Sequence, residues 1–241
     1  MRRRTKIIVT LGPASDDAKT IRRLLTAGAN AVRLNLSHGS PDDHRSLIRR
    51  VREEAESIGH HVPIMLDLMG PRYRLGTIPE PGRTLRRGQE VTLSDDSEGA
   101  EVPIGNPELL EHLQPGERVL INDGMVELKV LHNRGPRVDA KVIVGGPIST
   151  RKGINLPDSV LPFRISTKDR RDIQMAVEEE VDFLAASYVG SAADIESIRR
   201  RVKRAGGDLP LVAKLERARA IEHIDEIVDC ADAVMVARGD L

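Results

Sequence analysis

The chain has 241 residues, and its 37 lysines and arginines balance 37 aspartates and glutamates, so the formal net charge at pH 7 is zero. With no basic field, two phenylalanines, two tyrosines and no tryptophan, the composition argues against a nucleic-acid partner. One cysteine, Cys230, excludes an internal disulfide and favours a reducing, cytoplasmic location. No apolar run approaches the ~18 residues of a membrane span, so we expect no membrane partner.

The first part of the chain alternates short apolar runs with amphipathic segments. Three runs are typical of buried strands, at residues 6–11, 31–35 and 62–68. Between them, Ser15 is expected to cap a first helix, and Ser40, followed by Pro41, a second. This rhythm of strand and helix predicts a parallel sheet.

The rhythm changes over residues 73–156, where short valine- and leucine-rich runs are separated by glycine, proline, asparagine and aspartate. This pattern is typical of an all-β domain. A structureless loop of that length is rare in a compact protein, so we predict a small β domain inserted into the α/β one.

The alternation resumes after the insert, where Ser166 is expected to cap a helix. Three further strands are predicted, at residues 183–186, 211–215 and 233–237. Between the last two, Ile221, Ile224 and Val228 are spaced as the buried stripe of one helix. Six strands fall short of the eight that close a (β/α)8 barrel, so a closed barrel does not fit the chain.

Polar residues end the predicted strands, where parallel sheets and barrels carry their chemistry. Lys214 and Glu216 are two residues apart, so both point to one side of their strand. Taken alone, they could form a simple ion pair. With Asp240 at the next strand end, the two carboxylates suit Mg²⁺, and a lysine beside that metal suits phosphoryl transfer.

A second polar group follows an earlier strand, with Arg33, Asn35 and Ser37 on one side by alternation. Arg33 could grip a phosphate or a carboxylate with two hydrogen bonds. The oxygens of Asn35, Ser37 and Asp67 are suited to a monovalent cation. For Ser37 and His38, the alternative is a turn with local backbone hydrogen bonds.

A basic run, Arg199-Arg200-Arg201 with Lys203 and Arg204, could suggest nucleic acid. It alternates with a helical apolar stripe, and the chain has few aromatic residues for base stacking. We therefore interpret the run as a solvated helix face.

Six sequence blocks resemble the pyruvate kinase family and occur in the family's order. They are KIIVTLGPAS from Lys6, RLNLSHG from Arg33, LDLMGP from Leu66, KGINLP from Lys152, KLE from Lys214 and MVARGDL from Met235. The resemblance implies an α/β fold with a TIM-type (β/α) barrel, about six of its eight units present, interrupted by an inserted all-β lid. The implied domains are 1–72 (first barrel part, three strands), 73–156 (lid) and 157–241 (second barrel part).

The family transfers a phosphoryl group from phosphoenolpyruvate to ADP, giving pyruvate and ATP in the last step of glycolysis, so the resemblance implies this phosphotransferase activity. Carried over by position, the catalytic residues would be Lys214 and Arg33, the Mg²⁺ or Mn²⁺ ligands Glu216 and Asp240, and the substrate-binding residues Arg33, Lys214, Gly239 and Asp240. The monovalent-cation site would comprise Asn35, Ser37, Asp67 and the backbone carbonyl of Leu68, and the nucleotide would lie near His38 and Lys152.

One position bears on the monovalent cation that the resemblance implies. Arg72 stands where K⁺-dependent members of the family carry glutamate and K⁺-independent members carry lysine. A fixed cation there could replace bound K⁺, so we expect weak or absent K⁺ dependence.

Two other functions stay open, because the last two barrel strands and the C-terminal domain of the family have no counterpart in the sequence. The chain could be a catalytically silent homologue acting through a partner chain, and inactive alone. It could also be a metal-dependent barrel lyase acting on phosphoenolpyruvate or a 2-oxo acid. As protein partner we expect a homo-oligomer, a tetramer if full length, or a complementing C-terminal chain.

Overall fold

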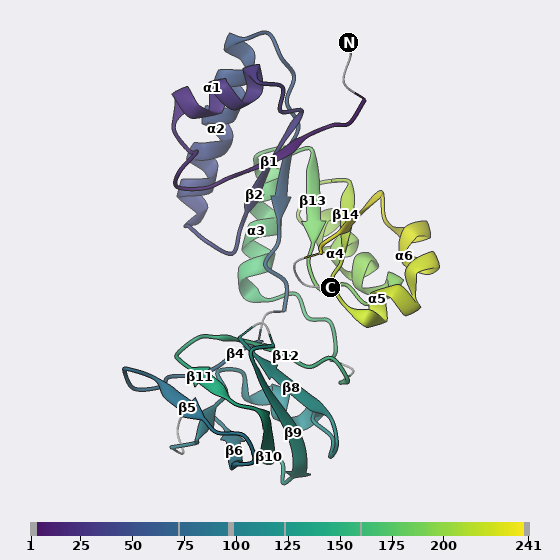
Figure 1. Ribbon diagram of the computed structural model, residues 1–241. Helices are drawn as coiled ribbons and strands as arrows, with labels where there is room; N and C mark the ends of the chain where they lie inside the picture. The colour runs from purple at the N-terminus through teal and green to yellow at the C-terminus, as the bar shows by residue number, and fades with distance from the viewer. Residues whose placement is uncertain (1–3, 72, 96–98, 123, 160, 239–241) are drawn as a thin grey trace. The chain divides into compact units, whose positions relative to one another are not determined.

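The computed structural model describes residues 4–71, 73–95, 99–122, 124–159 and 161–238. They form two compact units, each with its own hydrophobic core. The first unit comprises Met1–Pro71 and Phe163–Leu241, and the second comprises Arg72–Pro162. Figure 1 shows that the first unit draws its strands from both parts of the chain, coloured purple to blue and green to yellow.

The first unit is built on a parallel sheet whose strands follow chain order. The strands described are β1 (Ile8–Leu11), β2 (Ala31–Asn35), β3 (Ile64–Asp67), β13 (Phe183–Ala186), β14 (Leu211–Leu215) and β15 (Ala233–Val236). Each pairs in parallel with its neighbour, so their carboxyl ends share one edge. The bounds predicted for β2, β13 and β14 are those observed.

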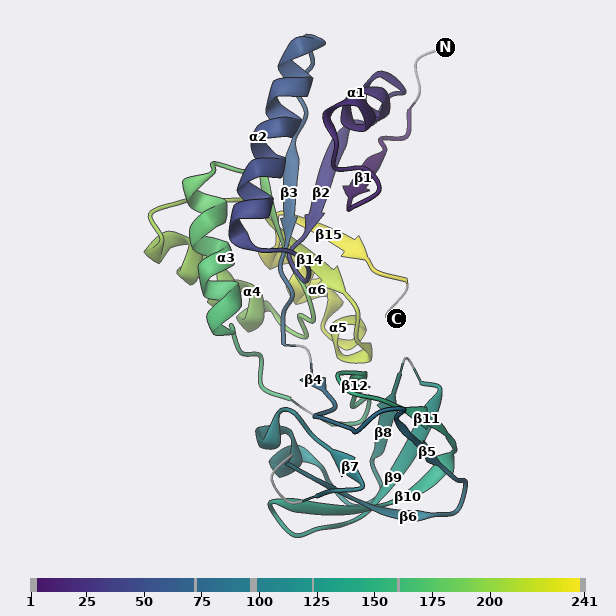
Figure 2. The ribbon, with the colours of Figure 1, turned by 90° about the vertical axis from the view of Figure 1, so that its left-hand side faces the viewer.

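Helices connect these strands and pack on one face of the sheet. They are α1 (Ala18–Thr26), α2 (Pro41–Ser57), α3 (Thr167–Glu178), α4 (Ala192–Arg204), α5 (Ala218–Glu222) and α6 (Ile224–Cys230). Figure 2 shows α2, α3 and α4 on the same side of the strands. Strand residues such as Leu34, Leu66 and Leu184 form the main core with them. A parallel sheet in chain order with its helices on one face is the TIM-type arrangement, which confirms the predicted fold class.

The opposite face of the sheet carries a much smaller apolar cluster. Met65, Ala185 and Val212 are buried there, with Phe183 and Met235 packed against them. Because side chains alternate along a strand, this face and the main core take alternate residues of β3, β13 and β14. The polar residues that follow the apolar cluster along these strands therefore project on this second face.

Side-chain caps begin the first three long helices. Ser40 and Ser166 are caps, as predicted: each accepts a hydrogen bond from the backbone N–H three residues later, and each belongs to a capping box. The prediction for α1 was wrong, because its N-cap is Asp17, whose Oδ1 accepts from the N–H three residues later at 3.0 Å. Ser15 Oγ accepts from the N–H of Gly12 at 3.1 Å and so closes the preceding turn.

The last predicted helix is divided in two, and the predicted apolar stripe is wrong. Residue His223, with φ −111° and ψ 25°, ends α5 and precedes α6. The buried residues of these two helices are Ala220 and Ile227, one position before Ile221 and Val228. The predicted stripe, Ile221, Ile224 and Val228, is exposed.

The second unit is an all-β body. Its elements are β4 (Tyr73–Arg74), β5 (Arg83–Leu85), β6 (Glu90–Ser94), β7 (Val102–Pro103), the 3₁₀ helix η2 (Pro107–His112), β8 (Arg118–Ile121), β9 (Val126–Asn133), β10 (Arg137–Val144), β11 (Gly146–Ile148) and β12 (Gly153–Asn155). The described strands form a seven-stranded sheet and the pair β11–β5. Alternate residues of β8, β9 and β10 fill its core.

The second unit extends beyond residue 156, where the sequence analysis placed the boundary. Asp158 accepts hydrogen bonds from the backbone N–H and the guanidinium of Arg118 at 2.7–3.0 Å. Ser159 Oγ donates to Glu117 at 2.5 Å. These contacts hold Asp158 and Ser159 to the β unit. Among the described residues of both units, no helix is long and apolar enough to cross a membrane.

The observed burial on α6 predicts a large effect at one residue and a small effect at its neighbour. Ile227→Ala removes a fully buried side chain and should lower the free energy of unfolding by about 2–5 kcal/mol. Val228, 49% exposed, is the matched control, and Val228→Ala should change it by about 0.5 kcal/mol or less. Urea unfolding midpoints measure both effects. Equal losses, or a larger loss for Val228→Ala, would contradict the observed burial and support the stripe predicted from the sequence.

Candidate functional site

A group of charged and polar side chains lies at the carboxyl ends of β2, β3, β13 and β14. Lys214 and Glu216 come from β14 and the residue after it, Asp67 ends β3, and Arg33 lies on β2. Lys214, Glu216 and Asp67 are all buried. Charges at this depth must be paired and hydrogen-bonded, so their contacts determine whether the site is stable.

The ammonium group of Lys214 lies among three oxygen atoms. Its Nζ is 2.6 Å from Glu216 Oε1 and 3.3 Å from Asp67 Oδ1, and it donates to Ser187 Oγ at 2.7 Å. The ammonium therefore forms two ion pairs with carboxylates and one hydrogen bond with a hydroxyl. The ion pair between Lys214 and Glu216, which the sequence left open as a simple alternative, is present, and it belongs to a larger network.

Glu216 is held from two directions. Its Oε1 faces Lys214, and its Oε2 accepts a hydrogen bond from the backbone N–H of Tyr188 at 2.7 Å. Tyr188 has φ +60°, the left-handed region that non-glycine residues rarely occupy. The residue with this strained backbone is also the one whose N–H donates to Glu216, so the strain lies directly beside the buried carboxylate.

Asp67 joins Lys214 to Arg33. Its Oδ2 accepts from Arg33 Nε at 2.7 Å and also from Arg33 Nη2, so two guanidinium donors share one oxygen, and its Oδ1 accepts from Ser187 Oγ at 3.2 Å. Arg33 Nη1 donates to Thr10 Oγ1 on β1 at 2.9 Å. The Arg33 side chain stays 24% exposed while that of Asp67 is 2% exposed, so the guanidinium is the accessible member of the pair.

Ser187 connects the two acidic residues through Lys214, and sequence analysis did not single it out. Its hydroxyl accepts from Lys214 and donates to Asp67, so both roles of a hydroxyl are used. The feature of the sequence that could have identified Ser187 is its position as the first polar residue after the apolar strand β13. Gly70 contacts it closely, because a Cβ at Gly70 would lie 2.9 Å from the Ser187 carbonyl oxygen. With φ +67°, position 70 favours glycine on conformational grounds as well.

The other predicted cation ligands lie near this network. Asn35 is in register with Asp67, and its Oδ1 accepts from the backbone N–H of Ser37 at 3.0 Å. This is the local turn considered as the alternative for this segment. Leu68 is buried, and its N–H donates to the Ala185 carbonyl. His38 is exposed after the turn.

Of the remaining predicted residues, one is described outside this group and three are not described. Lys152 lies in the second unit, exposed before β12. Arg72, Gly239 and Asp240 lie outside the described residues. Within the described ranges, no group of three or more histidine, cysteine, aspartate or glutamate residues could hold a metal ion.

A buried histidine lies on α2 beside the loop that carries Ser37. Burial lowers the pKa of His44, and the charge of Lys168 lowers it further, while a hydrogen bond with the His38 backbone opposes the shift. Its Nε2 has no hydrogen-bond partner among the described residues. His44 is therefore neutral at pH 7 in the folded chain.

Comparison with known proteins identifies the family. The family model described as pyruvate kinase, barrel domain, matches residues 2–241. The chain belongs to the pyruvate kinase family. It is 40% identical over 244 residues to a pyruvate kinase of Agrobacterium vitis and 42% identical over 248 residues to pyruvate kinase II of Salmonella typhimurium. A pyruvate kinase of Thermococcus litoralis is 38% identical over 242 residues.

These matches cover 99% of this chain and 51–52% of the relatives. The chain therefore spans about half the length of the curated relatives it matches. The strand-end network belongs to the part of the family that is matched, because the barrel-domain match includes β2, β3, β13 and β14. The sequence resemblance to pyruvate kinase is confirmed.

The buried network predicts a large loss of stability when its cation is removed. Lys214→Met leaves the buried carboxylates of Glu216 and Asp67 short of one cation and should lower the free energy of unfolding by about 3–5 kcal/mol. Lys203→Met, at an exposed position of α4, is the matched control and should change it by about 0.5 kcal/mol or less. Urea denaturation at pH 7 measures both. Equal stability of the two variants would show that the network contributes nothing.

His44 predicts a pH dependence of stability. In the unfolded chain this imidazole titrates near its ordinary pKa of 6.5, whereas the folded chain binds the proton only at lower pH. Between those values the unfolded state binds more protons, so stability should fall as the pH is lowered through 6.5. His44→Gln should reduce this slope, and His60→Gln, at an exposed position, should leave it unchanged. Urea midpoints between pH 8 and 5.5 measure it, and an identical slope in both variants would contradict the assignment.

Proposed function

We propose that the chain carries the phosphoenolpyruvate- and metal-binding part of a pyruvate kinase, which transfers a phosphoryl group from phosphoenolpyruvate to ADP. The observation that supports this most directly is the buried network of Lys214, Glu216, Asp67, Ser187 and Arg33 at the strand ends. Burying two cations and two carboxylates costs desolvation free energy, so stability alone is a weak reason for a protein to contain such a cluster.

Two cations would act on the phosphoryl group. In the reaction, the bond between phosphorus and the enol oxygen breaks, a bond to the terminal phosphate oxygen of ADP forms, and the enolate takes up a proton to give pyruvate. Arg33, the exposed member of its ion pair, would bind phosphate oxygens, and Lys214 would stabilise the charge on the transferring group. Both side chains are already oriented by Asp67 and Ser187, so little reorganisation is needed when substrate arrives.

Mg²⁺ or Mn²⁺ would be held by Glu216 and Asp240. Each Glu216 oxygen has one protein donor and retains a further lone pair, so the carboxylate can accept a metal without losing both partners. Mg²⁺ commonly takes only one or two protein carboxylates and completes its shell with water and substrate oxygens. The donor chemistry of Glu216 therefore fits the metal, which would neutralise charge on the phosphoryl group when bound.

The remaining proposed ligands concern the monovalent cation and the nucleotide. The monovalent-cation site would comprise Asn35, Ser37, Asp67 and the Leu68 carbonyl. The side chain of Arg72 would take the place of bound K⁺ there. The pairing of Asp67 with Arg33 and Lys214 supports a site that needs no further cation, because two fixed positive charges already face this carboxylate. ADP would lie near His38 and Lys152.

A coupled assay tests the proposed reaction. With phosphoenolpyruvate, ADP and MgCl₂, pyruvate formation is followed through lactate dehydrogenase. Lys214→Met should lower kcat by about 10²–10³-fold or more, because it removes a charge that stabilises the transition state. Lys203→Met should retain the activity of the unsubstituted chain, and Glu216→Gln should raise the Mg²⁺ concentration needed for half-maximal rate.

Three other results would redirect the proposal. Pyruvate formation without ADP would indicate the lyase. No turnover by a chain with a cooperative unfolding transition, combined with retained phosphoenolpyruvate binding, would indicate a catalytically silent homologue. Turnover that is insensitive to Lys214→Met in a folded variant would contradict the site itself.

A further inference from the structure

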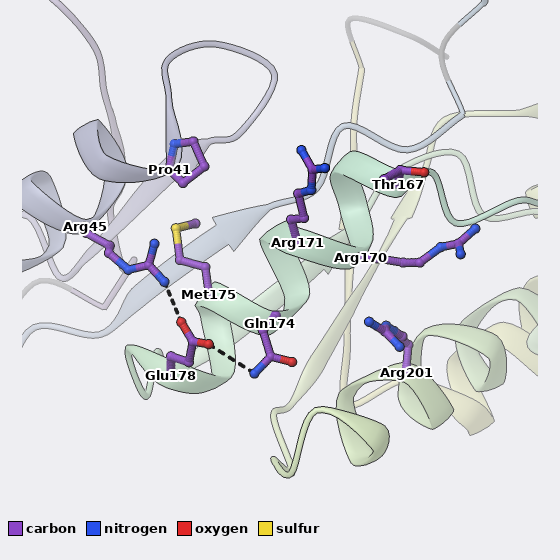
Figure 3. A pocket seen from close by; sticks show the side chains of 9 residues that line it. All are labelled: Pro41, Arg45, Thr167, Arg170, Arg171, Gln174, Met175, Glu178 and Arg201. Atoms are coloured by element: carbon purple, nitrogen blue, oxygen red, sulfur yellow. Dashed lines mark hydrogen bonds and ion pairs between the residues drawn. The ribbon is translucent and has the colours of Figure 1, made fainter.

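A groove lies on the solvent-facing side of α3, outside the strand-end site. Its volume is about 420 Å³, within the range of small-molecule sites. Figure 3 shows its lining, in which α3 forms the floor and α2 and α4 supply residues on either side. Four arginines line it, namely Arg45 from α2, Arg170 and Arg171 from α3, and Arg201 from α4.

The positive charge of the groove is only partly compensated. Glu178 is the one carboxylate among its lining residues, and it pairs with Arg45, which also contacts Glu179 at 3.2 Å. The guanidinium of Arg170 donates to the backbone carbonyl of Ile165, which carries no net charge. In the described part of the chain, no carboxylate pairs with the remaining two arginines of the groove.

Arg201 has a donor that lacks a partner. Its Nε is buried and makes no hydrogen bond within the described ranges. An unsatisfied buried N–H costs free energy, and more when the group is charged. The same α4 carries Arg200, which is exposed and does not line the groove. The solvated-face interpretation therefore holds for Arg200 but is wrong for Arg201.

The chemistry of the lining indicates the kind of ligand. Guanidinium groups bind phosphate through paired N–H donors, and a phosphate dianion has enough oxygens for more than one arginine. Pro41 and Met175 add apolar contacts that a carbon skeleton can cover. We propose that this groove binds a small molecule that carries a phosphate group, through the lining arginines that no carboxylate neutralises in the described part of the chain, Arg170, Arg171 and Arg201.

Calorimetric titration with inorganic pyrophosphate, at constant ionic strength, tests this proposal on the full chain. The double variant Arg171→Gln/Arg201→Gln should weaken binding by about tenfold or more, because it removes two charged donors. Arg200→Gln changes the same charge one residue away and should alter the affinity by less than about twofold, since an exposed charge outside the groove contributes little. Urea midpoints should match among these variants.

Arg33→Gln separates this groove from the strand-end site, which also has affinity for phosphate under the proposed function. Binding that survives Arg33→Gln and is lost in the double variant supports the groove. Binding lost in Arg33→Gln and retained in the double variant, equal losses in the double variant and in Arg200→Gln, or no pyrophosphate binding at all would overturn the proposal. Tighter binding of hexaglutamate than of pyrophosphate would overturn it in favour of an acidic peptide.

Discussion

The buried ammonium group of Lys214 is the constraint on which the rest of the candidate site depends. Removing such an ion from water costs several kcal/mol, and only close, well-oriented oxygens offset that cost. Glu216 and Asp67 supply opposite charge, and Ser187 supplies the third acceptor. Each oxygen comes from a different position along β3, β13 and β14 or just after them. The register of these three strands therefore cannot shift by one residue without leaving the ammonium unpaired.

That constraint extends into the backbone around the network. Ser187 can lie between Lys214 and Asp67 only because Gly70 has no side chain to meet its carbonyl group. The N–H of Gly70 donates to Asp169, the same residue that completes the capping box at the start of α3. The start of α3 thus contacts the loop after β3 directly. A helix on one face of the sheet and a charged cluster on the other are joined through one carboxylate.

Sequence reasoning succeeded where the signal is local and failed where it depends on contacts between distant segments. Strand β14 and the Ser166 cap follow from apolar runs and from a serine before a helical stripe. The predicted stripe across α5 and α6 failed because the buried Ala220 and Ile227 have the same seven-residue spacing as Ile221 and Val228, so spacing alone cannot tell which face turns inward. The ion pair of Arg33 with Asp67 was also missed, since these residues meet only when β2 pairs with β3.

The charges of Arg33 and Lys214 are balanced by those of Asp67 and Glu216, so these four side chains together carry no net charge. Two cations and two carboxylates cancel, so a phosphate group gains attraction from Arg33 only by competing with Asp67 or by using N–H groups that Asp67 leaves free. Arg33 has five N–H donors, and two nitrogens, Nε and Nη2, face Asp67 while Nη1 faces Thr10. Nη1 and Nη2 each carry a second hydrogen. Under the proposed function, these outer donors on a partly exposed guanidinium would give a phosphate two points of contact while the Asp67 pair keeps the group in place. The carboxylate that neutralises Arg33 is thus also what orients it, and preorganised donors of this kind stabilise developing charge without moving during the reaction.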